Sequence, residues 1–198
     1  MRILVYEFVS GGGLAGRDVP ASLGREASAM LTALVADLAA IGCHEIVTTA
    51  DARIPQAMPP GVEVVTLPPA RKARESMLDG LMASADAVWL VAPETDRCLE
   101  RLAAKVERQQ TPLVGAGADA IRRASDKAGL PRRLARTGVR HPTTCALGPG
   151  ADWARAAREV VGYPVVVKPA RGAGCDGVYL ARSARELASR INSSLNCF

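Results

Sequence analysis

The residues best suited to chemistry lie in a glycine-rich stretch, YPVVVKPARGAGCDGV, over residues 163–178. Backbone N–H groups at glycines can approach a phosphate closely because no Cβ intervenes, and a flexible turn can fold over the bound anion. Lys168, in the buried-type apolar strand that enters the turn, would place a point charge beside the same phosphates. We therefore predict a phosphate-binding loop at Gly172, Gly174 and Gly177. The alternative is an ordinary glycine turn with a surface lysine.

The order of strand and turn separates this loop from other nucleotide-binding motifs. The three glycines satisfy GxGxxG, but a dinucleotide site requires a strand, a glycine turn and then a helix. Residues 178–181 read VYLA, which is typical of a strand, so the loop is predicted to join two strands of a β-hairpin. A protein kinase carries its lysine on a later strand, whereas Lys168 comes first. Neither GxxxxGKS nor GxxxxGKT is present, which excludes a P-loop.

A second candidate lies earlier in the chain, in the sequence ASDK over residues 124–127. A helical pattern is predicted over residues 126–136, and GVRHP follows at residues 138–142. Considered alone, the serine or the aspartate would be a helix N-cap and Lys127 would be a solvated residue. This segment therefore indicates a functional site only when it is considered together with the glycine-rich stretch.

Together, the aspartate–lysine pair, GVxxP, YPVVVKP and GxGxxGV resemble the front of the ATP-grasp fold. In that family both lysines bind ATP phosphates, and the glycine hairpin closes over the β- and γ-phosphates. The resemblance implies that ATP is bound by Lys127, Lys168, Gly172, Gly174 and Gly177, with Mg²⁺ as a second cofactor. The family's Glu and Asn ligands for Mg²⁺ belong to a following subdomain that we expect to be missing. No metal-binding or catalytic residue is therefore assigned in this chain.

The N-terminal region carries a narrower resemblance. MRILVYEFVSGGG at residues 1–13 and APETD at residues 92–96 resemble the pre-ATP-grasp domain of the tyramine–glutamate ligase-like subgroup of methanofuran biosynthesis. Both segments follow predicted strands, and open α/β sheets bind ligands in the crevice at strand C-termini. Glycine amides would meet a carboxylate and a glutamate would meet an amine; the implied substrate-binding residues are Glu7, Ser10, Gly11, Gly12 and Glu94. The alternatives are a simple turn, and a glutamate that favours a helix N-terminus.

Short β-rich runs alternate with helical patterns over residues 1–117, which predicts a parallel α/β domain. We expect strands at 3–9, 46–49, 62–67, 87–91 and 113–114, and helices at 23–38, 73–85 and 95–108. The first apolar run is nearly continuous, as expected for a strand buried on both faces. The predicted fold class is α/β, with a parallel-sheet, Rossmann-like pre-ATP-grasp domain followed by the first α+β subdomain of an ATP-grasp fold.

Residues 118–191 are predicted to form that second subdomain, which is incomplete. We expect helices at 119–124, 126–136 and 153–161, and strands at 141–146, 164–168 and 178–181. Ser183 and Glu186 form a capping box that opens a last helix. Residues 192–198 read as an atypical tail, because the chain's two asparagines fall there and none occurs earlier. A truncated or disrupted reading frame is the expectation, and a natural polar tail is the alternative.

Composition excludes several classes of protein. No apolar run approaches the roughly 20 residues of a membrane helix and no signal peptide is recognisable, so we expect a cytoplasmic protein without a membrane partner. The five cysteines are scattered without a CxxC pair, which argues against a disulfide framework and a zinc site. The net charge is −3 over residues 1–118 and +8 over residues 119–198. A basic half is expected either for a polyanion site or for a solvated arginine-rich surface.

The combined prediction is an ATP-dependent ligase that joins a small-molecule carboxylate to an amine through an acyl phosphate. We expect this chain to be inactive by itself, because half of an ATP clamp should bind ATP weakly. A noncatalytic nucleotide-binding or regulatory fragment is the alternative. Nucleic acid is a disfavoured partner, because the basic half has few aromatic residues on which bases could stack.

Overall fold

The computed structural model describes residues 1–148, 150–175 and 177–195. The chain divides into two compact units, which are described separately below. The first unit contains residues 1–93 and 97–121, and the second contains residues 94–96 together with the chain from 122 onward.

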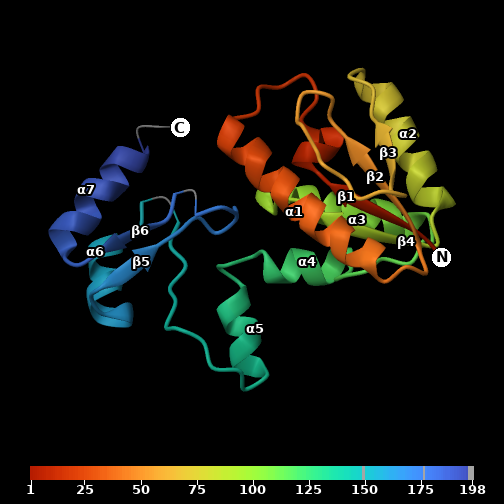
Figure 1. The fold of residues 1–198 in the computed structure, drawn as a ribbon. Helices are drawn as coiled ribbons and strands as arrows, with labels where there is room; N and C mark the ends of the chain where they lie inside the picture. The colour runs from red at the N-terminus through yellow and green to blue at the C-terminus, as the bar shows by residue number, and fades with distance from the viewer. Residues whose placement is uncertain (149, 176, 196–198) are drawn as a thin grey trace. The chain divides into compact units, whose positions relative to one another are not determined.

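The first unit is built on a parallel sheet (Figure 1). Its four strands have the order β3-β2-β1-β4, and every pairing is parallel. Their bounds are β1 Arg2–Glu7, β2 Glu45–Ala50, β3 Glu63–Thr66 and β4 Ala87–Val91. The prediction of a parallel α/β domain is therefore confirmed. The expected strand at residues 113–114 is reduced to a single bridge between Val88 and Leu113.

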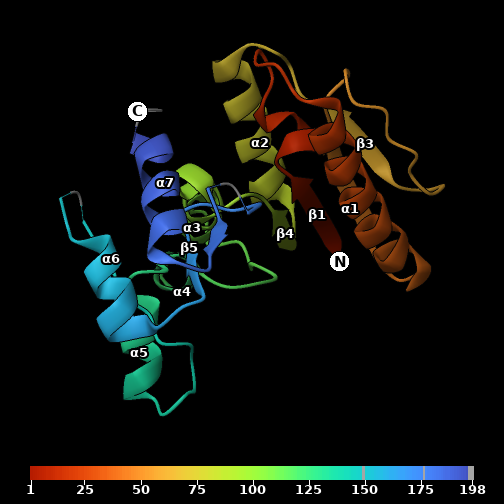
Figure 2. The same cartoon turned by 90° about the vertical axis from the view of Figure 1, so that its left-hand side faces the viewer.

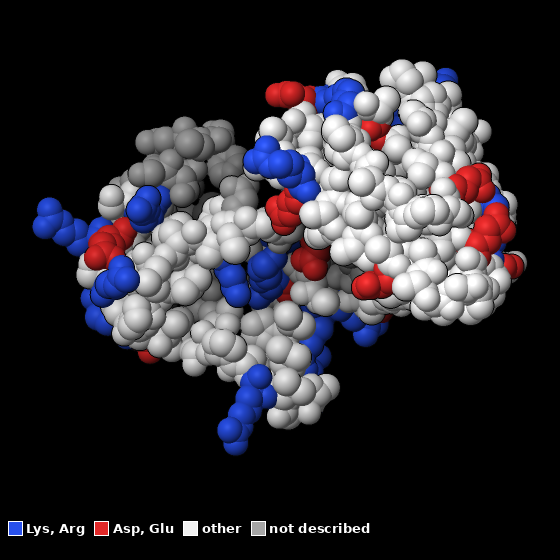
Figure 3. Space-filling model, viewed as in Figure 1, with Lys and Arg blue, Asp and Glu red and all other residues white. Residues whose placement is uncertain are grey.

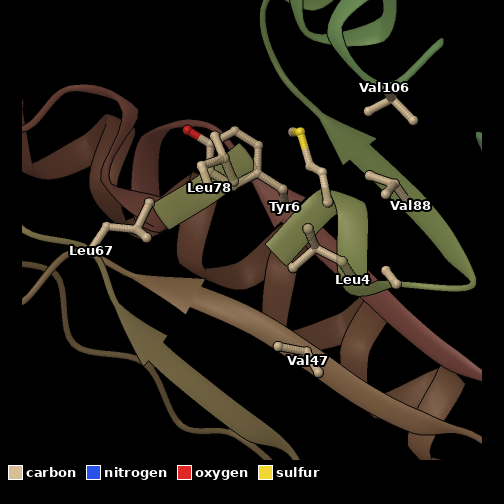
Figure 4. Packing of buried hydrophobic residues seen from close by; sticks show 9 residues of the cluster. Leu4, Tyr6, Val47, Leu67, Leu78, Val88 and Val106 are labelled. Atoms are coloured by element: carbon tan, nitrogen blue, oxygen red, sulfur yellow. The ribbon is translucent and has the colours of Figure 1, made fainter. Parts of the chain in front are cut away.

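Both faces of β1 are buried, which explains its nearly continuous apolar sequence. Leu4 and Tyr6 point into one core cluster, shown in Figure 4 with residues of β2, β4 and two helices. Ile3 and Val5 point into a second cluster on the opposite face. Side chains alternate along a strand, so four consecutive apolar residues are needed to cover the two faces.

Helices cover both faces of this sheet. Helix α1 (Ala21–Ala40) packs Leu31, Val35 and Leu38 against one face, while α2 (Arg71–Ser84) and α3 (Cys98–Arg108) pack against the other. Figure 2 shows α1 and α2 on either side of β1. The heptad-like spacing of apolar residues in α1 therefore corresponds to its buried stripe.

The predicted helix at residues 95–108 begins later than expected. A short 3₁₀ turn occupies Thr95–Arg97, and the α-helix begins at Cys98. Asp96 and Arg97 have φ values of 52° and 57°, in the left-handed region. Two consecutive left-handed residues cannot continue a right-handed helix, and their conformation is costly for side chains with a Cβ.

The second unit is an α+β arrangement around a two-stranded antiparallel sheet, β5 (Val165–Val167) and β6 (Tyr179–Ala181). Helix α6 (Trp153–Ala156) continues as a π-helical turn at Ala157–Val161, and α7 is Ala184–Leu195. These elements enclose a small core of Ala157, Val165, Ala181 and Leu187. Two further helices, α4 (Ala118–Ala124) and α5 (Leu130–Arg136), precede them in the sequence.

Two predicted elements of this unit are wrong. The helix expected at residues 126–136 begins only at Leu130, because Asp126 forms a turn in which its side chain and carbonyl accept from Gly129 N. The strand expected at residues 141–146 is absent from the described sheet, which pairs only β5 with β6. Pro142 lacks an N–H donor, which weakens that segment as a strand.

The capping box before α7 is present in modified form. Ser183 Oγ accepts from Glu186 N at 3.3 Å, while the Glu186 carboxylate accepts from Arg182 N at 2.8 Å, one residue before the serine. Residues 192–195 of the predicted tail continue α7, and residues 196–198 lie outside the described residues. Among the described helices, none is long and apolar enough to cross a membrane.

Replacing Leu31 with alanine should destabilise the first unit. Leu31 is fully buried in α1, and a buried Leu→Ala change costs about 2–5 kcal/mol through lost transfer energy and the cavity left behind. Leu23→Ala, at an exposed position of the same helix, should cost about 1 kcal/mol or less. Denaturant unfolding followed by circular dichroism measures both changes, and equal losses would contradict the assignment of the core.

Candidate functional site

The glycine-rich stretch forms a β-hairpin. Val165 pairs with Ala181, Val166 with Leu180 and Val167 with Tyr179, and the strands are antiparallel. A strand and not a helix therefore leaves the glycine loop, as predicted. This geometry excludes the strand–turn–helix arrangement of a dinucleotide site at this position.

The two faces of the hairpin differ sharply. Val165 and Ala181 are 6% and 0% exposed on the inner face, whereas their neighbours Val166 and Leu180 are 59% and 44% exposed on the outer face. Lys168 is also exposed, and its position two residues after Val166 assigns it to the outer face. The expectation of a buried strand is therefore wrong for one face, because no described element covers it.

The loop between the strands contains several left-handed residues. Gly172, Gly174 and Gly177 have φ values of 140°, 68° and 65°. Gly177 also passes close to Pro169, since an added Cβ would lie 2.8 Å from the proline Cγ. Asp176 lies outside the described residues. Glycine is required here by backbone conformation and, at Gly177, by the close approach of the ring.

Lys127 is bonded directly to this loop. Its backbone N–H donates to Ala170 O at 2.9 Å, and its Nζ donates to Gly172 O at 2.5 Å. The side-chain contact joins residues 45 positions apart in the sequence. The structure thus brings Lys127 together with the glycine loop, and Lys168 directly follows the strand that leads into the loop.

Asp126 shapes the turn that carries Lys127. Its carboxylate accepts from Gly129 N at 3.0 Å and pairs with Arg133 at 3.5 Å. The Gly129 N–H lowers the pKa of this carboxyl group, with further contributions from Arg133 and Arg171. The aspartate therefore acts as a turn former between α4 and α5, and the lysine side chain is left free to reach the loop.

The predicted residues of the first unit have a largely internal role. Glu7 and Ser10 are 2% and 0% exposed, and Glu7 Oε2 accepts from Ser10 N at 2.5 Å and from Ser10 Oγ at 2.7 Å. The carboxylate thereby holds the backbone turn that follows β1. A buried carboxylate needs such hydrogen bonds to offset the cost of its desolvation.

The glycines after Ser10 are needed for packing. Val9–Gly13 forms one π-helical turn, in which Gly12 has a φ of 94°. An added Cβ on Gly11 would lie 2.5 Å from Thr49 Oγ1, whose hydroxyl donates to Gly11 O. The turn is therefore pressed against the end of β2. Glu94, the fifth predicted substrate residue, is half-buried and falls in the second compact unit with residues 95–96.

Two family models match consecutive parts of the chain: the pre ATP-grasp 3 domain over residues 44–121, and the carbamoyl-phosphate synthase L chain, ATP binding domain, over residues 126–197. These matches and the solved structures below support the ATP-grasp superfamily. The chain has an ATP-grasp fold. It comprises a pre-ATP-grasp domain followed by an ATP-grasp subdomain, which confirms the predicted fold class. No curated protein matches the sequence.

Several solved structures share this ATP-grasp fold at low sequence identity. A candidate ATP-grasp superfamily protein from Archaeoglobus fulgidus has a TM-score of 0.64 and 19% identity, covering 93% of this chain and 50% of that chain. The biotin carboxylase domain of Hydrogenobacter thermophilus 2-oxoglutarate carboxylase, in complex with MgADP, ADP and bicarbonate, has a TM-score of 0.63 and 18% identity, with coverages of 98% and 40%. Campylobacter jejuni biotin carboxylase, in its β,γ-ATP complex, has a TM-score of 0.56 and 18% identity, with coverages of 97% and 40%. The chain thus spans about half or less of their length.

Charge in this ATP-grasp chain is concentrated in the second unit. Residues 119–198 carry 14 basic and 6 acidic side chains. Figure 3 shows one face on which Lys and Arg groups outnumber acidic groups over this unit. Among the described residues, no group of three or more His, Cys, Asp or Glu is arranged to hold a metal ion.

Sequence reasoning missed an ion pair at the end of β2. Arg53 binds the buried Asp51 carboxylate through Nε at 2.9 Å and Nη2 at 2.7 Å, and it also donates to the carbonyls of Leu14 and Arg17. Arg53 lowers the pKa of Asp51 through this hydrogen bonding. Asp51 N donates to Ser10 O, so the pair anchors the segment after the glycine turn. The position of an aspartate directly after a predicted strand was the available signal.

Lys127→Met should loosen the glycine loop. The variant removes the Nζ–Gly172 bond but keeps the backbone bond to Ala170, and a charged hydrogen bond is typically worth 1.5–3 kcal/mol. Amide hydrogen exchange at Gly172 and Gly174 should therefore accelerate about tenfold. Lys168→Met serves as the control and should leave these rates within about twofold. Equal effects of the two variants would refute the contact.

Asp51→Asn should alter the acid sensitivity of the first unit. The folded pKa of Asp51 lies below its unfolded value of about 3.9, so the paired carboxylate stabilises the protein above pH ~4. This contribution is lost as the pH falls through the folded pKa. The difference in unfolding free energy between wild type and variant should thus shrink from pH ~6 to pH ~2. Asp37→Asn, at an exposed position, should show little difference at either pH.

Proposed function

We propose that this chain supplies the substrate-side domain and the first half of the ATP clamp of a carboxylate–amine ligase. The observation that carries the proposal is the hydrogen bond from Lys127 to Gly172. Gly172 lies in the loop of the β5–β6 hairpin, and Lys168 stands between the end of β5 and this loop. Two cationic side chains and a glycine loop then lie within one structural unit. The ATP-grasp fold supports ATP-dependent ligase chemistry of this general kind.

The phosphates of ATP are assigned to Lys127, Lys168 and the loop of Gly172, Gly174 and Gly177. The Lys127 ammonium donates to the Gly172 carbonyl, which is a weaker partner for a cation than a phosphate oxygen. ATP would therefore displace this contact. Neutralising phosphate charge is the main protein contribution to phosphoryl transfer.

The adenine ring is assigned to the outer face of the hairpin. Val166 and Leu180, which are paired in the hairpin, are 59% and 44% exposed there, and Lys168 follows Val166 by two residues. An apolar surface beside a cation suits a purine attached to a triphosphate. A second part of an ATP-grasp clamp would cover the other side of the ring.

We assign the binding of the carboxylate and amine substrates to the first unit. The carboxylate would resemble glutamate and the amine would resemble tyramine. Glu7 and Ser10 would act by holding the turn, and Gly11 and Gly12 by presenting its backbone. Glu94, which falls in the second compact unit, is assigned separately to the amine. The assignment of the turn is supported by its location at the C-terminal end of β1. Methanofuran biosynthesis would be the corresponding pathway.

The proposed reaction has two steps. A substrate carboxylate oxygen attacks the γ-phosphorus of ATP, and the bond to the β,γ-bridging oxygen breaks, giving an acyl phosphate and ADP. The amine then attacks the acyl carbon, loses a proton and releases phosphate, leaving an amide. Mg²⁺ would neutralise phosphate charge, and its ligands are expected in the remainder of the protein. The glycine loop would exclude water from the acyl phosphate.

A noncatalytic nucleotide-binding fragment remains the second candidate, because the chain spans only 40–50% of the similar structures. The 198-residue chain can be incubated with MgATP, tyramine and glutamate. ADP formation above a protein-free blank would rule out the noncatalytic fragment. Nucleotide binding without ADP formation is expected both of the half-clamp proposed above and of a noncatalytic fragment. Steeply salt-dependent binding of DNA or RNA that ATP does not affect would contradict both.

Lys168→Met should weaken nucleotide binding by about tenfold, because one charged contact to a phosphate is lost. Isothermal titration of the chain with MgADP measures this change. Val166→Glu should also weaken binding, since it would place a carboxylate on the proposed adenine surface. Lys72→Met, at an exposed position of α2 in the first unit, is the matched control and should bind within twofold of wild type. Unchanged affinity in Lys168→Met would remove the role assigned to this lysine.

A further inference from the structure

Arg74 differs from four arginines that form ion pairs in the described part of the first unit, namely Arg2, Arg53, Arg71 and Arg97. It lies in the first turn of α2 and is half-buried. Its Nη1 donates to Pro69 O at 2.7 Å and to Pro68 O at 3.5 Å. The guanidinium is thus fixed by backbone carbonyls of the β3–α2 connection, while most of its five N–H groups remain available for another acceptor.

None of the ion pairs given for the described residues involves Arg74. Arg71, one turn earlier on the same helix, pairs with Glu75 at 2.8 Å although it is 82% exposed. Arg53 pairs with Asp51, and Arg97 with Glu100. A partly buried guanidinium without a carboxylate loses solvation that an anionic partner would restore. Among Arg53, Arg71, Arg74 and Arg97, Arg74 is therefore the arginine that forms no ion pair with a carboxylate.

The position of Arg74 is that of a ligand site in an open parallel sheet. The strand order β3-β2-β1-β4 places the topological switch point between β1 and β4, and ligands of such sheets bind outside the carboxyl ends of the strands there. Arg74 lies at the carboxyl edge of this sheet on the β3 side, because the Pro68 and Pro69 carbonyls that hold its guanidinium follow the end of β3.

The glycine turn borders the same place. An added Cβ on Gly12 would lie 3.4 Å from Leu67 Cβ, and Leu67 directly precedes the prolines that hold Arg74. Of the carboxylates nearby, Asp51 pairs with Arg53 and Glu75 pairs with Arg71, while Glu7 accepts from Ser10. Among the described residues, none of these three carboxylates forms an ion pair with Arg74.

We propose that Arg74 binds the carboxylate of a small-molecule ligand at the C-terminal edge of the first unit's sheet, beside the turn at Gly12. The choice of a carboxylate rests on the proposed ligase function. A guanidinium matches a carboxylate through two parallel N–H···O bonds, which gives direction as well as attraction. Arg74 thereby selects a ligand of the first unit that carries a carboxylate.

The test uses the whole 198-residue chain labelled with ¹⁵N and titrated with L-glutamate. A saturable shift of the Arg74 Nε–H and Gly12 N–H signals is expected. Arg74→Gln should weaken the affinity at least tenfold, and Arg74→Lys should recover part of the loss because it keeps the charge but not the planar geometry. Arg71→Gln removes the same charge one turn away and should bind within twofold of wild type.

Several outcomes would overturn the proposal. These are the absence of a saturable Arg74 shift in the wild type, an equal loss in Arg71→Gln, or tighter binding of inorganic phosphate than of glutamate at the Arg74 signal. The presence or absence of a saturable Arg74 shift in the wild-type protein tests the proposal even if a variant fails to fold. MgADP titrated into the same samples should perturb the loop glycines in Arg74→Gln as in wild type. Loss of MgADP binding with retained glutamate binding would refute the nucleotide function and leave the Arg74 site standing.

Discussion

The two hydrogen bonds from Lys127 to the hairpin loop organise the second unit. Helix α5, helix α6 with its π-helical turn, and strand β5 lie between Lys127 and the loop, yet the side-chain bond to Gly172 joins them across 45 positions. A short helix and a two-stranded sheet have little apolar area of their own, so such polar ties matter more here than in a large core. The same ammonium group that holds the loop is also the one that a phosphate would attract.

The first unit depends on a different constraint, the burial of β1 on both faces. The strand separates two apolar clusters and has paired neighbours on both sides. Its carboxyl end therefore has to carry the polar groups that cannot enter the core. Glu7, Ser10 and the glycine turn satisfy one another there, and Asp51 and Arg53 secure the segment that follows. A rigid, mutually bonded edge of this kind can present Arg74 in a defined orientation.

Several elements were predictable because their signals are local. The apolar run of β1, the stripe of α1 and the strand after the glycine loop depend on alternation or helical spacing within the segment itself. The predictions that failed depended on contacts with distant segments or on local hydrogen bonds that compete with the predicted element. Asp126 was predicted to open a helix but bonds to Gly129 in a turn, and the segment at 141–146 has apolar character but no partner strand among the described residues. Likewise, an apolar strand sequence does not reveal that one face of β5 is uncovered.

The sequence by itself determined the parallel α/β class of the first unit and the hairpin nature of the glycine loop, since both follow from residue type and spacing. The ATP-grasp organisation was implied by the resemblance of the motifs to that family. Tertiary structure alone decided which charged groups are free. Glu7 and Arg53 form hydrogen bonds with other residues of the chain, and Lys127 donates to the glycine loop. Arg74 retains guanidinium N–H groups that are not used by its bonds to the backbone carbonyls. The physical reason is that a charge gains its partner from segments distant in the sequence, and only the packed chain fixes those distances.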